Sequence, residues 1–409
     1  MKFLRATVLI AAVGAVSAFS SARPVFSADA PAAKEAGQSM NDPAALAQSE
    51  IDKALAFLKG QQQPDGSWQK EGEPPALTAI ALRGFVGDPK SADQPFVQKG
   101  FDKLLTFQKD DGSISSDILA TYNTAIATSA FAKTNNPKYK PAVDKAVAYL
   151  RSIQWTDKIE GVKDQNKKVD PNDPNYGGWG YGHGKGRADL SNAQMAIEAL
   201  HDAGLKPGDP AFDAALKFVT RTQNNSETND QKWASDDGGF VYFPGNGGGS
   251  ETGDEVGPNG QRIVRSYGSM TYAGIKSMIY CGLSQNDPRV KAAFNWVRKN
   301  WTMDINPGMQ FSDPTGKNPK AAESGLYYYY HTLARALRAY GDPQVTDAKG
   351  AVHDWRVELL EHLAKQQNAD GSFQGTQRWM ENRPNLSTAF AVLAAEEALA
   401  DLKEHPVKK

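Results

Sequence analysis

The sequence predicts an all-α domain made of about six copies of a two-helix repeat. Pairs of segments carry apolar residues at helical spacing, and the second segment of each pair is apolar on nearly every face. A short turn built around Asp-Gly separates the two helices of most copies, and Gly or Pro follows the second helix. One copy cannot bury both of its helices, so the copies must stack on one another.

The first copy contains each part of the repeat. Residues 51–58 have the apolar spacing of an amphipathic helix, and the turn 64–68 (Pro-Asp-Gly-Ser-Trp) ends that helix. Residues 76–85 form a second helix that is almost wholly apolar, as expected for a helix buried on all sides. Gly87 can supply a left-handed cap, and Pro89 cannot continue the helix.

Five further copies follow the same order of outer helix, turn and inner helix. The expected outer and inner helices are 101–108 and 122–131, 143–155 and 191–203, 212–223 and 267–280, 290–301 and 326–340, and 355–367 and 386–399. Such copies can close into a ring whose central cavity is lined by the N-terminal ends of the inner helices. Segments 156–175 and 224–265 are expected to be loops on the ring, the second being Gly-rich, acidic and mobile.

The N-terminus is typical of a secretory signal. Lys2 and Arg5 precede an apolar run that is too short to span a bilayer comfortably, and small residues follow. We therefore expect an exported protein, periplasmic or extracellular, with an uncleaved anchor as the alternative, and no later segment is apolar enough to cross a membrane. The expected divisions are a signal peptide at 1–30, a linker at 31–44, the toroid domain at 45–402 and a C-terminal tail at 403–409.

Composition argues against several classes of function. The chain has 46 basic and 47 acidic residues, a formal net charge of -1, and the two signs are interspersed. Binding to nucleic acid needs a clustered basic excess, so no nucleic-acid partner is expected. Cys281 is the only cysteine, so no internal disulfide is possible, and its place at the end of an apolar helix indicates a buried, inert thiol.

The repeated turns resemble a known motif. Residues 63–68 (Gln-Pro-Asp-Gly-Ser-Trp) and 367–373 (Gln-Asn-Ala-Asp-Gly-Ser-Phe) resemble the QW repeats of the squalene-hopene cyclase and oxidosqualene cyclase superfamily. Protein prenyltransferase β subunits share that fold. The resemblance covers residues 45–400 and implies one (α/α)6 toroid, whereas full triterpene cyclases have two. It also implies that the motif's glutamine, here Gln63, caps an outer helix and that its aromatic residue stacks on the next repeat.

The resemblance points to a candidate acid. Triterpene cyclases protonate an alkene with the central Asp of an Asp-x-Asp-Asp motif at the start of an inner helix, and the best positional match here is 189–192, Asp-Leu-Ser-Asn. Asp189 is kept, but Ser191 and Asn192 replace the other two carboxylates, and a serine cannot protonate an alkene. Asp and Ser at a helix start are also typical capping residues.

A zinc site is incomplete in the sequence. Prenyltransferase β subunits hold zinc with an Asp, a Cys and a His, and Tyr330-His331-Thr332 resembles the part that contains the His. The matching region 265–270 has neither Asp nor Cys, and one His does not make a zinc site. The sequence therefore predicts no metal and no cofactor, and His331 is expected to line the cavity or to be held by a hydrogen bond.

The candidate site residues lie at or near the expected starts of inner helices and are mostly aromatic. The candidate catalytic residues are Asp189, Tyr267 and His331. The candidate ligand-cavity residues are Tyr122, Asn123, Trp179, Tyr181, His183, Asn192, Tyr272, Tyr328, Tyr329 and Trp379. Aromatic rings suit a polyisoprenoid through apolar burial and cation–π contacts, and they also suit sugar rings through stacking.

The sequence is compatible with three functions. The leading hypothesis is an exported toroid protein that binds an apolar, isoprenoid-like small molecule in its cavity. One alternative is a polysaccharide lyase or hydrolase on an α/α barrel, with a site assembled from Tyr267, His331, Arg265, Asp189 and Glu381. The other alternative is a non-catalytic module that binds a protein or peptide partner on the surface of the ring.

Overall fold

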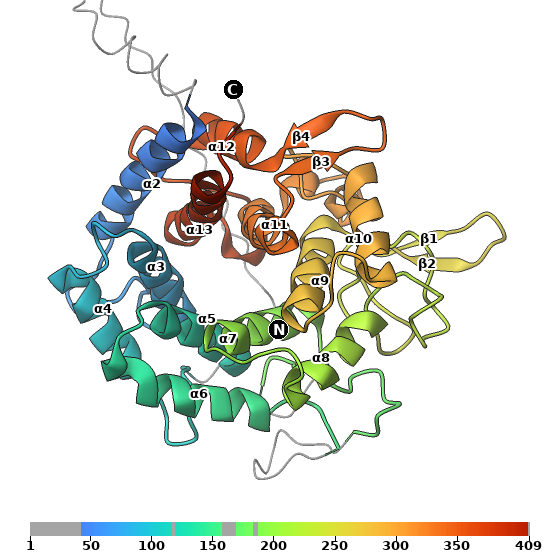
Figure 1. Ribbon diagram of the computed structural model, residues 1–409, viewed down its shortest axis with the longest axis horizontal. Coiled ribbons are helices and arrows are strands. Elements are labelled where there is room, and N and C mark those ends of the chain that lie inside the picture. The colour runs from blue at the N-terminus through green and yellow to red at the C-terminus, as the bar shows by residue number, and fades with distance from the viewer. Residues whose placement is uncertain (1–41, 117–118, 158–168, 183–186, 408–409) are drawn as a thin grey trace, which may run out of the picture. The chain divides into compact units, whose positions relative to one another are not determined.

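A computed structural model describes residues 42–116, 119–157, 169–182 and 187–407. Within these residues, twelve α-helices alternate along the chain between an outer and an inner position (Figure 1). The outer helices are α2 (Pro43–Gly60), α4 (Pro95–Leu105), α6 (Lys140–Ser152), α8 (Pro210–Arg221), α10 (Pro288–Lys299) and α12 (Trp355–Gln366). The inner helices are α3 (Ala76–Gly87), α5 (Ala120–Lys133), α7 (Leu190–Asp202), α9 (Gly268–Tyr280), α11 (Leu326–Tyr340) and α13 (Pro384–Glu404).

The inner helices form a closed ring. Each packs against the inner helix before it and the one after it, and α13 packs back against α3. The outer helices surround this ring, as Figure 1 shows. The predicted all-α toroid of about six helix pairs is therefore confirmed.

The sequence explains which helices lie inside. Every residue of α3 from Ala76 to Phe85 is buried, because an inner helix is covered by neighbours on all sides. In α2 the buried side chains include Ile51, Leu55 and Leu58, which share one face, while the opposite face is polar. Burial of each such large apolar side chain contributes about 1.5–3 kcal/mol.

Asp-Pro pairs begin several outer helices. Asp42, Asp209 and Asp287 are N-caps whose side chains accept hydrogen bonds from backbone N–H groups of the first helical turn, and a proline follows each of them. The sequence predicts that Asp287 and the following proline close an inner helix. They also start the next outer helix, so the connections from inner to outer helices are short.

One side-chain contact of the turn recurs around the ring. The amide of Gln108 donates to the carbonyl of Ala142 on α6 at 2.8 Å and so bridges two successive copies. Equivalent bridges run from Gln62 to Phe96, Gln154 to Ala211, Gln223 to Arg289 and Gln367 to Glu50. The bridge to Glu50 joins the last copy to α2 and closes the ring. In the first copy Gln62 makes the bridge, while the predicted capping residue Gln63 donates to the carbonyl of Gln61, the C-cap of α2.

The turn that carries this bridge also needs a glycine, because its backbone lies close to the next outer helix. Gly371 has φ +87°, and a Cβ atom there would lie 2.3 Å from the carbonyl oxygen of Lys53 on α2. Gly350 has nearly the same φ, +88°, with nothing within 4 Å of a Cβ atom. We expect Gly350→Ala to lower the free energy of unfolding by about 1 kcal/mol through backbone strain. Gly371→Ala should cost roughly 1–2 kcal/mol more, because the methyl group also separates the turn from α2.

Urea denaturation of the two glycine variants measures this difference. The free energy of unfolding and its denaturant dependence are compared with those of the wild-type protein. Equal losses in Gly350→Ala and Gly371→Ala would contradict the role of Gly371 in closing the ring.

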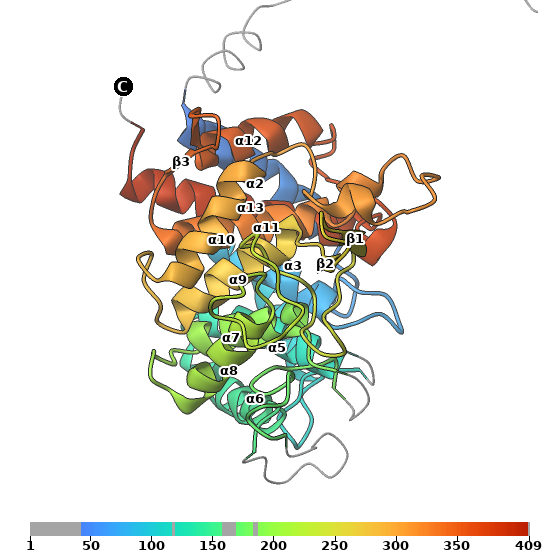
Figure 2. The ribbon, with the colours of Figure 1, turned by 90° about the vertical axis from the view of Figure 1, so that its right-hand side faces the viewer.

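The connections from outer to inner helices are the long ones, and they gather at one end of the ring (Figure 2, right). Within the expected loop 224–265, strands β1 (Asp254–Val256) and β2 (Arg262–Val264) pair antiparallel. Phe240 and Thr252 of this segment are fully buried. Much of 238–252 is thus packed, whereas 253–262, within the Gly-rich acidic stretch, is mostly exposed, and the expected mobility stays a prediction.

The helical domain runs from Pro43 to Glu404, against expected limits of 45 and 402. A second hairpin, β3 (Gln344–Thr346) and β4 (Val352–Asp354), connects α11 to α12. The expected signal peptide and the linker up to residue 41 lie outside the described residues. Among the residues that are described, no helix combines the length and apolarity needed to cross a bilayer.

Candidate functional site

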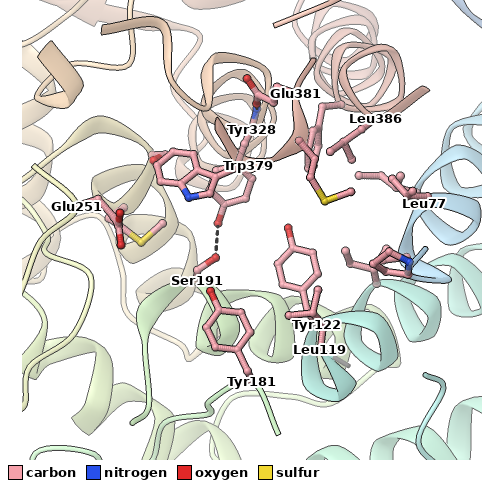
Figure 3. Close-up of a pocket in the computed structure, with 18 of the residues that line it drawn as sticks. Leu77, Leu119, Tyr122, Tyr181, Ser191, Glu251, Tyr328, Trp379, Glu381 and Leu386 are labelled. Carbon is pink, nitrogen blue, oxygen red and sulfur yellow. Dashed lines mark hydrogen bonds between the residues drawn. The ribbon is translucent and has the colours of Figure 1, made fainter. Parts of the chain in front are cut away.

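A cavity of about 260 Å³ lies where the inner helices begin. Each inner helix contributes a side chain from its first turns, namely Leu77 of α3, Tyr122 of α5, Ser191 of α7, Met270 of α9, Tyr328 of α11 and Leu386 of α13. The long connections add Tyr181, Tyr242, Glu251, Trp379 and Glu381 (Figure 3). The chamber therefore lies at the inner-helix N-termini, as the repeat predicts.

The two sides of the cavity differ in chemistry. The side chains from α3, α5, α13 and the residue before α5 include the apolar set Leu77, Ile80, Leu119, Ile126, Leu386 and Phe390. The side chains from α7, α9, α11 and the connections beside them include the hydroxyl-bearing set Tyr181, Ser191, Tyr242, Tyr267, Ser269 and Tyr328. Figure 3 shows Leu77 and Leu386 on one side and Ser191 and Glu251 on the other. The cavity is thus mostly apolar, with most of its hydroxyl groups on one side and the hydroxyl group of Tyr122 on the other.

Several cavity residues have strained backbone conformations. Leu119, Trp379 and Met380 have φ values of 52°, 54° and 66°, a region that costs of order 1–3 kcal/mol for a residue other than glycine. The indole ring of Trp379 lies against Gly325, where a Cβ atom would come within 2.4 Å of the ring. Such strain persists where the surrounding structure imposes it, and it is concentrated at functional sites.

Glu251 and Glu381 bring carboxyl groups to the cavity. Glu251 is ion-paired, whereas Glu381 is hydrogen-bonded through Oε1 and its Oε2 has no partner among the described residues. Glu251 pairs with Arg378 at 2.5 Å. Glu381 accepts a hydrogen bond from the backbone N–H of Tyr328, at the start of α11, at 2.8 Å. Burial raises the pKa of Glu381 to about 8, although backbone N–H groups at this helix start act in the opposite direction. Glu381 is therefore mostly uncharged at neutral pH.

Asp189 lies behind the cavity wall. Its carboxylate is the N-cap of α7 and accepts hydrogen bonds from the backbone N–H and the side-chain amide of Asn192, at 2.9 Å each for the shortest contacts. Burial raises the pKa of Asp189 to about 6, against the effect of the hydrogen bonds from Asn192. Of the predicted motif, Ser191 is the residue that lines the cavity.

The other two candidate catalytic residues have different places. Tyr267, directly before α9, lines the cavity and is 1% exposed. His331 lies about one turn further along α11 than Tyr328 and stacks on Phe390, with 5.6 Å between the ring centroids, outside the lining. Burial lowers the pKa of His331 to about 3, so its ring is neutral at physiological pH. In the described part of the chain, no group of three or more His, Cys, Asp or Glu side chains is arranged to hold a metal ion.

The predicted cavity residues are divided between the cavity and the core. The cavity is lined by Tyr122, Tyr181, Tyr328 and Trp379, while His183 lies outside the described residues. Successive residues of a helix point about 100° apart, so the direct neighbours of a lining residue face other helices.

The remaining predicted cavity residues pack in the core. The indole N–H of Trp179 donates to the carbonyl of Leu150 at 2.7 Å, and the hydroxyl of Tyr329 donates to the carbonyl of Thr302 at 2.7 Å. Tyr272 packs edge-on against Tyr329. The side-chain oxygen of Asn123 accepts from the backbone N–H of Ala76, and Asn192 is held by Asp189. Their expected contact with a ligand is therefore replaced by contacts within the protein.

Beyond the cavity, the centre of the ring holds buried charged groups. Glu198 of α7 is 1% exposed and forms ion pairs with Arg83 of α3 at 2.5 Å, with Arg335 of α11 at 3.3 Å and with Lys276 of α9. Arg335 also pairs with Glu397 of α13 at 2.8 Å. Burial alone would raise the pKa of Glu198, but Arg335, Lys276 and Arg83 together hold it well below its usual value.

This ion network is not among the features predicted from the sequence. Its signal is a lone charged residue inside an otherwise apolar inner-helix segment, as Arg83 is in 76–85 and Lys276 is in 267–280. A charged side chain on a helix that is buried on all sides needs a partner on another helix, so such residues predict ion pairs across the ring.

Solved structures of other proteins have a similar fold. Neither a protein-family model nor a curated protein matches this sequence. The structure is similar to the type II terpene cyclase MstE from Scytonema, with 14% identity, a TM-score of 0.52, and coverage of 87% of this chain and 99% of that one.

Two toroids with other activities are also similar. An alpha-amylase from Clostridium perfringens has 13% identity and a TM-score of 0.50, covering 85% of this chain and 97% of that chain. A D-mannose isomerase has 11% identity and a TM-score of 0.51, covering 87% of this chain and 97% of that chain. Similarity at this level of identity shows a shared fold alone. A shared function does not follow, because one fold serves many functions. The resemblance seen in the sequence is thus confirmed for the fold, and this chain is an α/α toroid like that of the type II terpene cyclase MstE.

Proposed function

We propose that this protein binds an apolar, isoprenoid-like ligand in the cavity at the inner-helix starts. The observation that carries the proposal is the lining of aliphatic and aromatic side chains, beside which Glu381 is mostly uncharged. Burial of apolar surface in such a site contributes roughly 25 cal/mol per Å². MstE, which has a similar fold, has been solved in complex with its product merosterolic acid A, so a toroid of this kind can hold such a ligand.

The lining does not support cyclisation started by the acid of the Asp-x-Asp-Asp motif. Ser191 has the cavity-facing place at the start of α7, and its hydroxyl group is too weak an acid to protonate an alkene. Asp189 lies behind the wall as a helix cap. Glu381, with a pKa of about 8, is also a weak acid for that step. The proposal is therefore ligand binding.

A glycosidase site is less well supported. Hydrolysis of a glycosidic bond uses two carboxyl groups that flank it, with one of them free to act as base or nucleophile. Glu251 is paired with Arg378, and Glu381 is mostly uncharged with one oxygen bound at the start of α11, so neither is an unpaired carboxylate ready to act as base or nucleophile. Arg265, which belongs to the alternative site in the sequence, pairs with Glu255 at 3.2 Å.

Filling the cavity is expected to abolish ligand binding. Ser191→Phe places an aromatic ring in the space between α7 and the opposite apolar wall. We expect the wild-type protein to bind farnesol, measured by titration of tryptophan fluorescence, and Ser191→Phe to bind it at least roughly tenfold more weakly, a loss of about 1.4 kcal/mol. Ser284→Phe, in the exposed turn after α9, is the matched control and should bind like the wild type.

Two results of this titration would overturn the proposal. One is the absence of farnesol binding by the wild-type protein together with clear binding of an oligosaccharide. The other is unchanged farnesol affinity in a Ser191→Phe protein whose circular dichroism and thermal unfolding match those of the wild type.

A further inference from the structure

A chain of hydrogen bonds connects the buried ion network to the cavity. The ammonium group of Lys276, which is 0% exposed, contacts both Glu198 and the side-chain oxygen of Gln194. The side-chain nitrogen of Gln194 donates to the hydroxyl oxygen of Tyr328 at 2.9 Å. Tyr328 lines the cavity, so the chain runs from the centre of the ring to the ligand chamber.

The direction of this chain follows from the donors that each group has. A lysine ammonium group carries hydrogen-bond donors and no acceptor, so the oxygen of the Gln194 amide must face Lys276. The NH₂ group of Gln194 must then face Tyr328 and donate to its oxygen. The hydroxyl oxygen of Tyr328 is thus used as an acceptor, and its own proton is directed elsewhere.

The proton of Tyr328 is directed either to Ser191 Oγ or into the cavity. Within the described residues, the further polar contact of this hydroxyl group is Ser191 Oγ at 3.3 Å, which is long for a bond between two hydroxyl groups (Figure 3). Ser191 lines the cavity as well, so a ligand oxygen can reach both groups. Burial raises the pKa of Tyr328, which keeps the hydroxyl group protonated.

The side chain of Tyr328 is held firmly in this position. Its backbone N–H donates to Glu381 at 2.8 Å, and its ring packs edge-on against Phe390, with 5.8 Å between the centroids. The ring is 9% exposed. A donor fixed by its neighbours loses little conformational entropy when it binds a ligand.

We propose that the hydroxyl group of Tyr328 donates a hydrogen bond to an oxygen atom of the ligand, so the ligand is an oxygenated isoprenoid such as an alcohol, aldehyde or ketone. This inference rests on the proposed function and adds the polar group that the cavity recognises. Tyr328 is the specificity-determining residue. Gln194 and Lys276 are positioning residues, because they act through the direction that they impose on the Tyr328 hydroxyl group.

The test compares two ligands that share a carbon skeleton. Farnesol carries an oxygen atom, and farnesene lacks it. We expect Tyr328→Phe to weaken farnesol binding about 3- to 10-fold, the usual worth of one hydrogen bond between neutral groups, and to leave the farnesene affinity within about twofold of the wild type. Tyr329→Phe is the matched control on the next residue of α11, because that hydroxyl group is bonded to Thr302 away from the cavity.

Gln194→Met tests the positioning role. This variant keeps the approximate volume of the side chain but removes the donor to Tyr328 and the acceptor for Lys276. We expect the ratio of farnesol to farnesene affinity to fall towards that of Tyr328→Phe. A purely structural role for Gln194 would weaken the binding of both ligands alike and leave the ratio unchanged.

The outcomes separate this inference from the proposed function. If wild-type protein binds neither farnesol nor farnesene, the proposed function fails and the inference fails with it. If the wild type binds both but Tyr328→Phe lowers the two affinities equally or not at all, the inference is overturned and the proposed function stands. Thermal unfolding of each variant shows whether a loss of binding comes from loss of folding.

Discussion

Glu198→Gln is expected to lower the free energy of unfolding by about 3–5 kcal/mol, the usual cost of removing one partner from a buried ion pair. The carboxylate of Glu198 is the shared partner of Arg83, Arg335 and Lys276 on three other inner helices. A neutral amide of the same size leaves these cations buried without that charge. Removing these cations from water during folding costs free energy, and the attraction to Glu198 that offsets most of this cost is then lost.

Glu404→Gln is the matched control for Glu198→Gln. Glu404 pairs with Arg338 at 2.7 Å, but its side chain is 56% exposed, so the loss should be below about 1 kcal/mol. Urea denaturation of both variants measures the two losses. Similar small losses in both would show that the cations of the network find other partners or reach water, and would contradict the network's role in holding the inner helices together.

Trp179→Ala is expected to destabilise the protein by about 3–5 kcal/mol, as truncation of a fully buried tryptophan does. The Trp179 ring is 0% exposed, and its N–H donates to the carbonyl of Leu150 at the end of α6. The substitution leaves a large cavity beside the end of α6 and removes the hydrogen-bond donor of the Leu150 carbonyl group. Thermal and urea unfolding followed by circular dichroism measure the loss.

Trp379→Ala is the comparison variant for Trp179→Ala. Both tryptophans are predicted from the sequence to line the cavity. Trp379 lines the cavity and is 38% exposed, so its truncation should cost about 1 kcal/mol or less in stability while it changes ligand affinity. The opposite pattern, with a stable Trp179→Ala protein and an unfolded Trp379→Ala protein, would reverse the assignment of the two residues to core and cavity.

The architecture of this protein is largely readable from its sequence because the signals are local. Apolar spacing in 51–58 and in 76–85 distinguishes an outer helix from an inner helix, and the Asp-Gly turn marks the change between them. Repetition of these signals also places the chamber, since every inner helix starts at the same end of the ring. No long-range information is needed for either conclusion.

Which residues line the cavity depends on tertiary contacts that cannot be seen in the sequence. Whether Ser191 or Asp189 faces the cavity depends on how α7 is rotated, and that rotation comes from packing against α5 and α9. Trp179 and Trp379 are the same residue type near the same chamber, yet a carbonyl on α6 holds one of them in the core. The ion pair between Arg83 and Glu198 joins residues more than a hundred positions apart, and no local pattern pairs them.

A crystal structure of the protein grown with farnesol would show whether the chamber at the inner-helix starts is the ligand site. We expect electron density for the isoprenoid chain between Leu77 and Leu386 on the apolar side and for the oxygen atom within hydrogen-bond distance of the Tyr328 hydroxyl group. Farnesol bound on the outer surface of the ring, or a chamber that holds ordered water at saturating farnesol, would contradict this expectation.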